Sequence, residues 1–244
     1  MLNKNAHYGC LFLLLASFWA CADSTLVQVE KVFDGDTVLL QDGRKIRFLG
    51  INSPEVAHGN QPAESGGEQA KLWLQQRLEH KFISLEGDSE AQDKYGRTLA
   101  HVFTQDQQHI NLQLVKNGLA TVSIFPPNLK YTEVLLAAQH SAEQAKLGIW
   151  GDAAYAPLPF QSLTADNYHG WKRITGRIQA IKQGVKGSYM QFSDQAAVLV
   201  DQQYTGQFPA LESYVGKNLE VRGWWYRSKQ RFILPVRHPG QIID

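Results

Sequence analysis

One turn signal near the start of the chain constrains most strongly how its first half can fold. The pair Asp42-Gly43 lies between two apolar runs, residues 36–40 and 45–51. An Asp-Gly pair in this setting is a strong signal for a β-hairpin. The first half is therefore expected to open with antiparallel strands.

The same turn predicts where the polar residues around it lie. With the turn centred on the Asp-Gly pair, Val38 lies opposite Arg47 and Asp36 opposite Leu49. The open end of the hairpin then gathers four polar side chains, those of Asp34, Asp36, Asn52 and Glu55.

Helical periodicity appears later in the first half. Apolar residues at helical spacing predict helices at about 67–78, from Asn111 as N-cap to the stop at Gly118, and at about 132–147. Two further strands are predicted, at 81–88 and 97–104. Together with the hairpin, these elements define a first domain over residues 23–151.

The second half has a different pattern. Residues 152–169 are rich in Ala, Pro and small polar residues and are interpreted as a linker. About five short strands follow in residues 170–244, a pattern typical of a small β-barrel. Charge also divides the chain, because residues 23–159 carry −5 and residues 160–244 carry +5. This asymmetry indicates a polyanionic partner for the basic half.

Residues 1–22 have the layout of a secretory signal peptide, with a basic head, an apolar run and Ala20-Cys21-Ala22 before Asp23. A mature chain that starts at Asp23 and is secreted or periplasmic is expected. A lipoprotein acylated on Cys21 is the alternative. Both cysteines lie in this segment, so the mature chain could not bind a metal through sulfur. The apolar run from Cys10 to Trp19 is too short to span a bilayer, and the sequence has no other long apolar run.

Oxygen-bearing side chains point to a hard cation. Asp34 and Asp36 offer carboxylates and Asn52 an amide oxygen, which suit calcium or magnesium. The histidines lack zinc-site spacing. Arg47 and Arg97 could grip a phosphate.

Glu55 could take a proton from water. A metal, two arginines and a carboxylate base suit attack on a phosphodiester. Each signal also has a plain structural interpretation. "DGDT" (34–37) and "DKYGR" (93–97) could be simple turns, and Arg47 could pair with an acid on the sheet surface.

The order and spacing of these motifs carry more information than each alone. "DGDT", "RFLGINSPE", "GEQAKLWL", "DKYGRTLA", "NLQLVKNGLA" and "AKLGIW" follow one another between about residues 26 and 150. This series resembles the staphylococcal nuclease (thermonuclease) family. The resemblance implies a mainly β fold with α, namely a five-stranded OB-type barrel with three helices. It also implies calcium-dependent hydrolysis of DNA and RNA.

The resemblance also implies roles for single residues. Asp36 and the backbone carbonyl of Ser53 are expected calcium ligands, and Asp34 is a nearby acid. Arg47 and Arg97 are expected to bind the phosphate and stabilise the transition state. Glu55 is the expected general base.

The chain departs from the family pattern at three positions. Asn52 stands where the family has a second calcium-binding Asp, so one weakly held calcium ion is expected. Ser123 and Phe125 stand where two tyrosines are usual, which affects base and end-group preference.

The basic second half resembles an OB-like nucleic-acid-binding module. Strict alternation in "NLEVRGWWYR" places Arg222, Trp224 and Tyr226 on one face, and Arg231 follows on an outward position. Exposed aromatic rings among arginines are typical of single-strand binding. As an alternative, Trp224 and Tyr226 pack on the linker or the first domain, or a bulge at Gly223 exchanges the faces.

The sequence thus favours a secreted metal-dependent nuclease acting on DNA, RNA or both, with no obligate protein partner. One rival is a nuclease-fold protein that binds nucleic acid or protein with little turnover. A phosphodiesterase for small nucleotides is the other.

Overall fold

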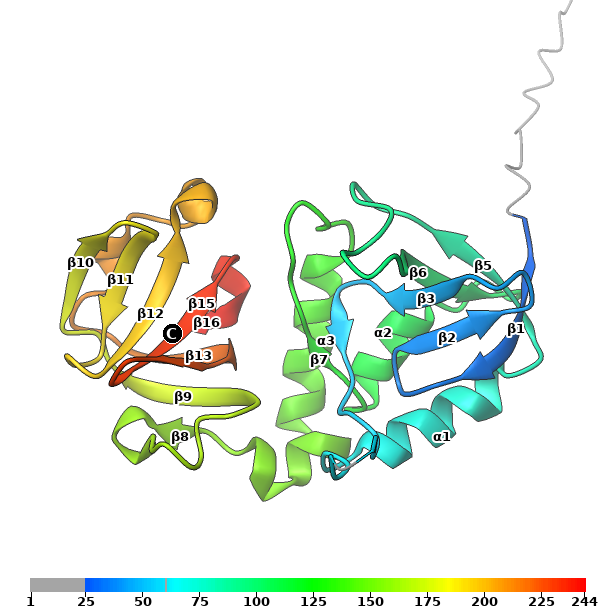
Figure 1. The fold of residues 1–244 in the computed structure, drawn as a ribbon, viewed down its shortest axis with the longest axis horizontal. Coiled ribbons are helices and arrows are strands. Elements are labelled where there is room, and N and C mark those ends of the chain that lie inside the picture. Colours follow the sequence, from blue (N-terminus) through cyan, green and yellow to red (C-terminus); the bar gives the residue numbers. More distant parts are fainter. Residues whose placement is uncertain (1–24, 60) are drawn as a thin grey trace, which may run out of the picture.

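The structure is a computed structural model that describes residues 25–59 and 61–244. Figure 1 shows two parts side by side, a mixed α and β domain and a β domain. The expected signal peptide, the mature start at Asp23 and the alternative lipid anchor at Cys21 lie outside the described residues. Within those residues, no helix is long and apolar enough to cross a membrane.

The first domain is built on a closed barrel. Its strands are β1 (Val27–Val32), β2 (Thr37–Leu40), β3 (Lys45–Phe48), β5 (Phe82–Glu86) and β6 (Thr98–Thr104). They close in the order β1-β2-β3-β6-β5, with β3 and β6 parallel. Inward side chains such as Val29, Ile46 and Ile83 are fully buried. The expected mainly β fold with an OB-type five-stranded barrel is confirmed.

The register of the β2–β3 hairpin differs by one residue from the expected one. Thr37, not Val38, lies opposite Arg47. The turn holds one residue more than expected, because Leu40 pairs with Arg44 through its N–H. Gly43 has φ +86°, a conformation that glycine adopts at low cost and that typically ends a three-residue hairpin loop.

Three α-helices accompany the barrel in the described part of the chain: α1 (Gly67–Leu78), α2 (Ile110–Lys116) and α3 (Thr132–Gln144). The bounds of α1 match the expectation. The helix expected to run to 147 ends earlier, and Lys146 and Gly148 take left-handed φ values of 51°. Gly148 approaches Gly118 so closely that a Cβ would lie 2.2 Å from the Gly118 oxygen.

Asn111 is not the N-cap of α2, as was expected. The N-cap is His109, and Asn111 lies inside the helix, fully buried. Its side chain accepts a hydrogen bond from the Val102 N–H and donates one to the Leu49 carbonyl. The buried amide therefore ties β6 to the segment after β3.

A short two-stranded sheet leads to the polar end of the barrel. β4 (Ile51–Asn52) pairs antiparallel with β7 (Thr121–Val122). The Ser123 N–H donates to the Gly50 carbonyl. This pairing brings the segment around Asn52 next to the segment around Ser123.

The second domain is formed by two sheets. One contains β10 (Ala180–Gly184), β11 (Gly187–Gln191), β12 (Ala196–Asp201), β15 (Arg231–Val236) and β14 (Tyr226–Ser228), in that order. The other contains β16 (Ile242–Ile243), β13 (Asn218–Trp224), β9 (Trp171–Arg177) and β8 (Leu158–Pro159), in that order. Both sheets contribute to one buried core, with Ile174 and Val221 from one and Val198 and Leu234 from the other.

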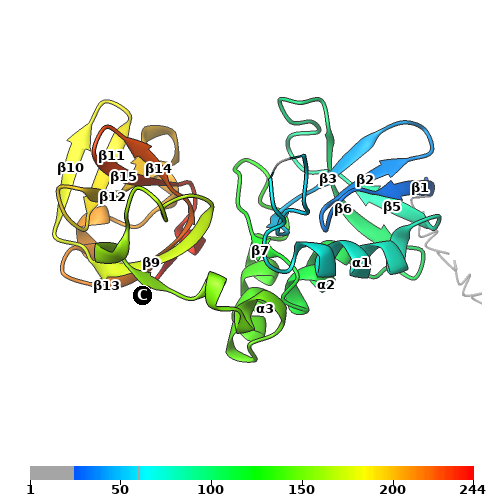
Figure 2. The same ribbon diagram turned by 60° about the horizontal axis from the view of Figure 1, so that its bottom comes forward.

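Part of the expected linker belongs to the second domain. β8 pairs in parallel with β9, and the ring of Phe160 stacks on Phe192 at 5.3 Å. Leu163 is buried in the same core. Figure 2 shows how the chain between α3 and β9 joins the two parts.

An ion-pair network fastens the second domain to α3. Glu143 of α3 accepts hydrogen bonds from both Nη atoms of Arg222, at 2.8 Å for Nη2. Arg173 lies 3.6 Å from Glu143 and donates from Nε to Glu220 at 2.8 Å. These side chains are 9–14% exposed, so the network is largely buried.

Candidate active site

Asp36 lies at the start of β2, at the polar end of the barrel. Its Oδ2 accepts from the Ser53 N–H at 2.7 Å and lies 2.8 Å from Nη1 of Arg47. Its Oδ1 accepts from the Thr37 hydroxyl at 3.1 Å. Asp36 is 5% exposed, and burial raises its pKa to about 7, while Arg47 opposes the rise.

Asn52 links the expected metal ligands to Arg47. Its Oδ1 accepts from Nη2 of Arg47 at 3.0 Å, and its Nδ2 donates to the Ser53 carbonyl at 3.0 Å. Arg47 also donates from Nη1 to the Phe48 carbonyl. Arg47 pairs with an acid, as the alternative expected, but this acid is the buried Asp36 of the site and not one on the sheet surface.

Arg97 is held by the turn that carries it. Oδ1 of Asp93 accepts from the N–H groups of Tyr95 and Arg97, and Oδ2 accepts from Nε of Arg97 at 2.7 Å. "DKYGR" is thus a turn, with Gly96 at φ +78°, and it also orients the arginine. The role of Asp93 was missed from the sequence, although its spacing four residues before Arg97 was visible.

The Glu55 side chain is exposed to solvent, and its carboxyl also interacts electrostatically with this cluster. Burial raises the pKa of its carboxyl, and nearby Asp34 and Glu64 raise it further. Arg47 and Arg97 lower that pKa. Glu55 therefore lies near enough to Asp34, Arg47 and Arg97 for their charges to affect its carboxyl.

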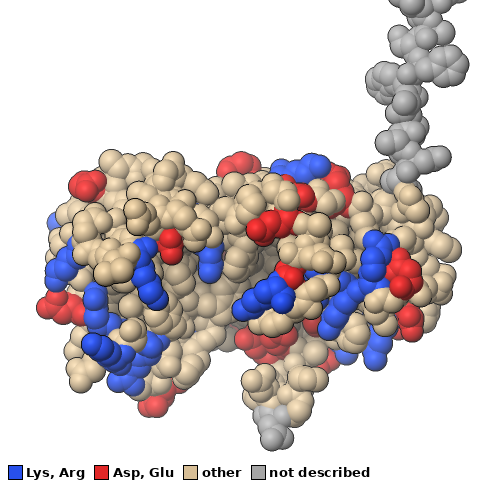
Figure 3. Space-filling view, turned by 45° about the horizontal axis from the view of Figure 1, so that its top comes forward, with Lys and Arg blue, Asp and Glu red and all other residues tan. Residues whose placement is uncertain are grey.

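A cleft of about 690 Å³ opens beside these residues. It is lined by Arg47, Asn52, Asp93, Tyr95, Arg97, Ser123, Phe125 and Trp224, among others. Figure 3 shows a hollow between the two domains with Lys and Arg side chains on both sides. Ser123 and Phe125, the two departures from the family pattern, thus line the cleft as the resemblance implies.

The prediction that Arg222 faces nucleic acid is wrong. Arg222 is 7% exposed and is occupied by Glu143 and Glu220. Alternation along β13 holds, but α3 covers the face on which Arg222 lies and supplies a carboxylate to it. Trp224 lies at the cleft, whereas Tyr226 and Arg231 are partly exposed outside it.

The donor atoms at Asp36 fit a hard cation only moderately well. Two carboxylates, Asp34 and Asp36, and the Ser53 carbonyl offer oxygens of the kind that calcium prefers. The raised pKa of Asp36 shows a buried carboxylate whose charge Arg47 alone does not offset. In residues 25–59 and 61–244, however, no three His, Cys, Asp or Glu side chains cluster as a metal site. The site therefore offers oxygen donors that together carry little negative charge.

The fold and the cleft together define an OB-barrel protein with two arginines that can bind an anion and with carboxylates beside them. A family model described as "Staphylococcal nuclease homologue" matches residues 45–152. The chain belongs to this family.

Known relatives agree with this assignment. The thermonuclease of Staphylococcus intermedius is 38% identical over 125 residues, which cover 50% of this chain and 74% of the relative. The thermonuclease of Staphylococcus hyicus is 34% identical over 134 residues, covering 54% and 79%. Endonuclease YncB of Bacillus subtilis is 32% identical over 134 residues, covering 53% and 63%. Most of the second domain lies beyond the residues matched by the family model.

Proposed function

We propose that this chain is an endonuclease that hydrolyses phosphodiester bonds of DNA, RNA or both. The observation that carries the proposal is that Arg47 and Arg97 line one cleft in a staphylococcal nuclease homologue. Asp36 pairs with Arg47 at this end of the barrel, and both arginines lower the pKa of the Glu55 carboxyl. The names of the relatives, thermonuclease and endonuclease, support the same activity.

The two arginines retain donors for a phosphate. Arg47 uses three N–H groups for Asp36, Phe48 and Asn52. A guanidinium has five N–H groups, so two remain, one on Nε and one on Nη2. Arg97 uses its Nε for Asp93, which leaves its Nη atoms for an anion. Two oriented guanidiniums suit a phosphodiester whose negative charge grows in the transition state.

Glu55 is the proposed general base. A base with a raised pKa is a stronger proton acceptor than an ordinary glutamate, and Glu55 remains partly accessible to water. It takes the proton of the water that attacks phosphorus. Arg47 and Arg97 hold the phosphate and neutralise the charge that develops on its oxygens.

We assign the metal role to Asp36, Asn52 and Ser53, with Asp34 beside them. One calcium ion bound there would supply Lewis-acid stabilisation of the phosphate. Because Asp36 would be the single charged direct ligand of the three, and Asn52 is shared with Arg47, weak binding follows.

Cleavage assays on plasmid, single-stranded DNA and RNA, with calcium or with chelator, test the activity. We expect cleavage with calcium and a strong decrease with chelator. Cleavage that chelator does not affect would remove the metal from the proposal. A chain that cleaves dinucleotides but not plasmid would instead be a small-nucleotide phosphodiesterase.

A binding protein with little turnover is the second candidate. The hydrogen bond between Asn52 and Arg47 favours this second candidate. The amide oxygen expected to bind the metal already accepts from the arginine expected to bind phosphate. Tight binding of nucleic acid without cleavage at any calcium concentration would identify this function.

The site of action is proposed to be the periplasm or the cell exterior, without an obligate protein partner. The proposal rests on the signal-peptide pattern of residues 1–22. Mass spectrometry of exported protein is expected to give an N-terminus at Asp23 without lipid.

A further inference from the structure

The second domain contributes a side chain to the cleft of the first. Trp224 lines the same cleft as Arg47, Arg97 and Phe125. It is 38% exposed, and Phe125 is 47% exposed. Two aromatic rings from different domains therefore offer free surface within the space that the arginines border.

The orientation of Trp224 follows from its neighbour in the chain. Trp225 is 4% exposed and belongs to the core of the second domain. Side chains on either side of an inward residue in extended chain point outward. Trp224 and Tyr226 therefore share the outer side of the domain.

At Trp225 the chain passes from β13 of the four-stranded sheet to β14 of the five-stranded sheet. Tyr226 pairs with Ile233, and Ser228 pairs with Arg231, so these residues share one face. Across the sheet, Leu199 pairs with Tyr189. This face is opposite to the core, to which Val198 and Leu234 point.

Tyr189, Tyr226 and Arg231 form a cluster on that outer face. The guanidinium of Arg231 lies 5.6 Å from the ring centre of Tyr189. Burial raises the pKa of the Tyr226 phenol, Tyr189 raises it further, and Arg231 lowers it. Strand pairing places all three side chains on the same face of the sheet.

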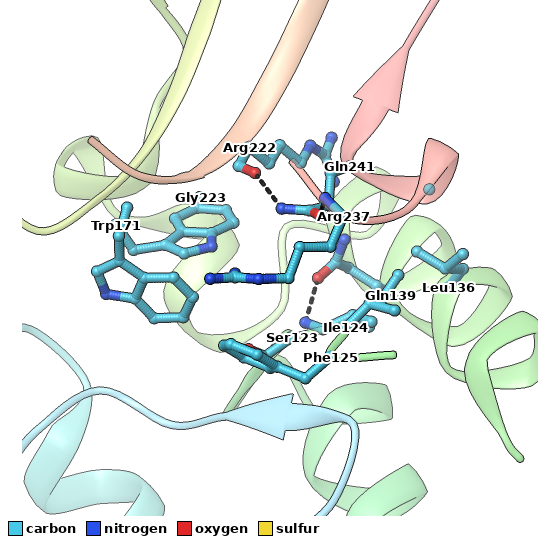
Figure 4. Close-up of a pocket in the computed structure, with 13 residues that line it drawn as sticks. Ser123, Ile124, Phe125, Leu136, Gln139, Trp171, Arg222, Gly223, Arg237 and Gln241 are labelled. Atoms are coloured by element: carbon cyan, nitrogen blue, oxygen red, sulfur yellow. Dashed lines mark hydrogen bonds between the residues drawn. The ribbon is translucent and has the colours of Figure 1, made fainter. Parts of the chain in front are cut away.

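Arg231 and Arg237 differ from the arginines that join the domains. Arg173 and Arg222 are occupied by glutamates, whereas neither Arg231 nor Arg237 forms an ion pair among the residues that the structure describes. Nε and Nη2 of Arg231 are buried without a hydrogen-bond partner among the same residues, so a phosphate would reach this guanidinium at Nη1. Figure 4 shows Arg237 extending toward Phe125, and the guanidinium lies 4.6 Å from the centre of that ring. Unpaired cations beside aromatic rings suit a chain that carries phosphates and bases.

We propose that a single strand of nucleic acid leaves the cleft over Trp224, on which an unpaired base stacks, and continues across the outer face of the second domain past Tyr226 to Arg231. This inference rests on the proposed nuclease function and specifies its substrate as unpaired strands.

The chemistry favours a single strand over a duplex. A base can lie on the Trp224 ring only when its own face is free, and bases of a duplex are covered by their neighbours in the stack. Ser123 has no aromatic ring. Trp224 of the second domain therefore supplies aromatic surface to the cleft that the first domain lacks at position 123. Arg231 and Arg237 meet the phosphates on either side.

The test uses the whole chain, with Trp224→Leu compared with Phe82→Leu. Phe82 is 45% exposed at the start of β5 and does not line the cleft, so it is a matched control. Substrates are a 12-nucleotide single strand and the duplex of the same sequence. We expect Trp224→Leu to raise KM for the single strand about tenfold, the range for loss of one stacked base. The rate on duplex should change less than twofold.

Binding provides a second readout that does not depend on turnover. Anisotropy of the labelled single strand is measured with chelator, so that cleavage does not interfere. Arg231→Gln is expected to weaken binding and to reduce the salt slope by about one phosphate contact. Arg177→Gln, an equal loss of charge at the end of β9, should leave the slope unchanged.

The outcomes separate this inference from the proposed function. If the wild type cleaves nothing, the nuclease proposal fails, and the binding measurements still decide the strand path. If Trp224→Leu reduces single-strand and duplex activity equally, or no more than Phe82→Leu does, the path is wrong. Trp224→Tyr should restore most of the preference for single strands, which a purely structural role of the indole would not predict.

Discussion

At the scale of single residues, Asn52 connects a phosphate-binding arginine to an expected metal ligand. One amide accepts from Arg47 and donates to the Ser53 carbonyl, and Ser53 in turn donates its N–H to Asp36. Phosphate binding and metal binding are thereby connected through one side chain. A change at this position is expected to alter both.

Asn52→Asp is predicted to shift calcium dependence. A second carboxylate beside Asp36 adds charge to the site, so half-maximal activity should occur at a lower calcium concentration. The new carboxylate would also pair with Arg47, so KM for substrate should rise. Activity against calcium concentration checks the first effect and substrate titration the second. An unchanged calcium midpoint would show that residue 52 is not a ligand.

Glu55→Gln is predicted to lose at least about 10²-fold in kcat, the range expected for loss of a general base. Its fold should be unaffected, because Glu55 contributes no side-chain hydrogen bond among the described residues. Circular dichroism and single-turnover kinetics are the measurements. Glu30→Gln, on the exposed face of β1, serves as the control and should cleave normally. Normal cleavage by Glu55→Gln would mean that the base lies elsewhere.

At the scale of elements, the junction of β6 and α2 carries two imidazoles in contact, the buried ring of His101 and the half-buried ring of His109. Nε2 of His109 lies 3.2 Å from Nδ1 of His101, and Tyr131 packs on both rings with centres 4.6 Å away. Burial lowers the pKa of each histidine to about 4. The first domain therefore folds with these rings neutral.

The pair predicts a loss of stability in acid. Unfolded histidine titrates near pH 6.5 and the folded rings near pH 4, so the unfolded state binds more protons between these values. The stability of the folded state with both rings neutral is therefore fully present above pH 6.5 and is lost as pH falls toward 4. The expected decrease in the free energy of unfolding at pH 5 is on the order of 1 kcal/mol per ring. Thermal unfolding of wild type and His109→Gln at pH 7 and pH 5 is the measurement. An equally steep loss in the variant would contradict this cause.

The elements also show what the sequence could predict. Periodicity was sufficient for α1, because its apolar spacing reflects the face that it buries. The hairpin was predicted but its register was not, since a turn with one extra residue also fits an Asp-Gly pair. Asn111 has N-cap chemistry, yet its amide is used in the core by Val102 and Leu49, which no local pattern reveals.

At the scale of the whole molecule, the hairpin could bring its polar residues together in the prediction because they are close in sequence. Trp224 was predicted to contact nucleic acid, but its place at the cleft of the first domain and the burial of Arg222 were not predicted, because both depend on how the second domain sits on α3. Arg222 meets a carboxylate 79 residues away, and alternation along one strand contains no information on that partner.

Glu143→Gln is predicted to loosen the two domains. It removes the charge that Arg222 and Arg173 share, at a cost of about 3 kcal/mol for a largely buried pair. Calorimetry should resolve two unfolding transitions in place of one, and proteolysis between α3 and β9 should accelerate. Glu133→Gln, exposed in the first turn of the same helix, is the control. Identical unfolding of Glu143→Gln and wild type would show that apolar packing alone joins the domains.

The position of Glu143 on α3 has a mechanical consequence. One helical turn before it, Gln139 accepts from the Val122 N–H, in the strand that leads to Ser123. Helix α3 is therefore bound to the second domain at one turn and to the wall of the cleft at the previous turn. A pulling force on a long polymer bound to the second domain would be transmitted through α3 and would deform the cleft. A short fragment would exert no such force.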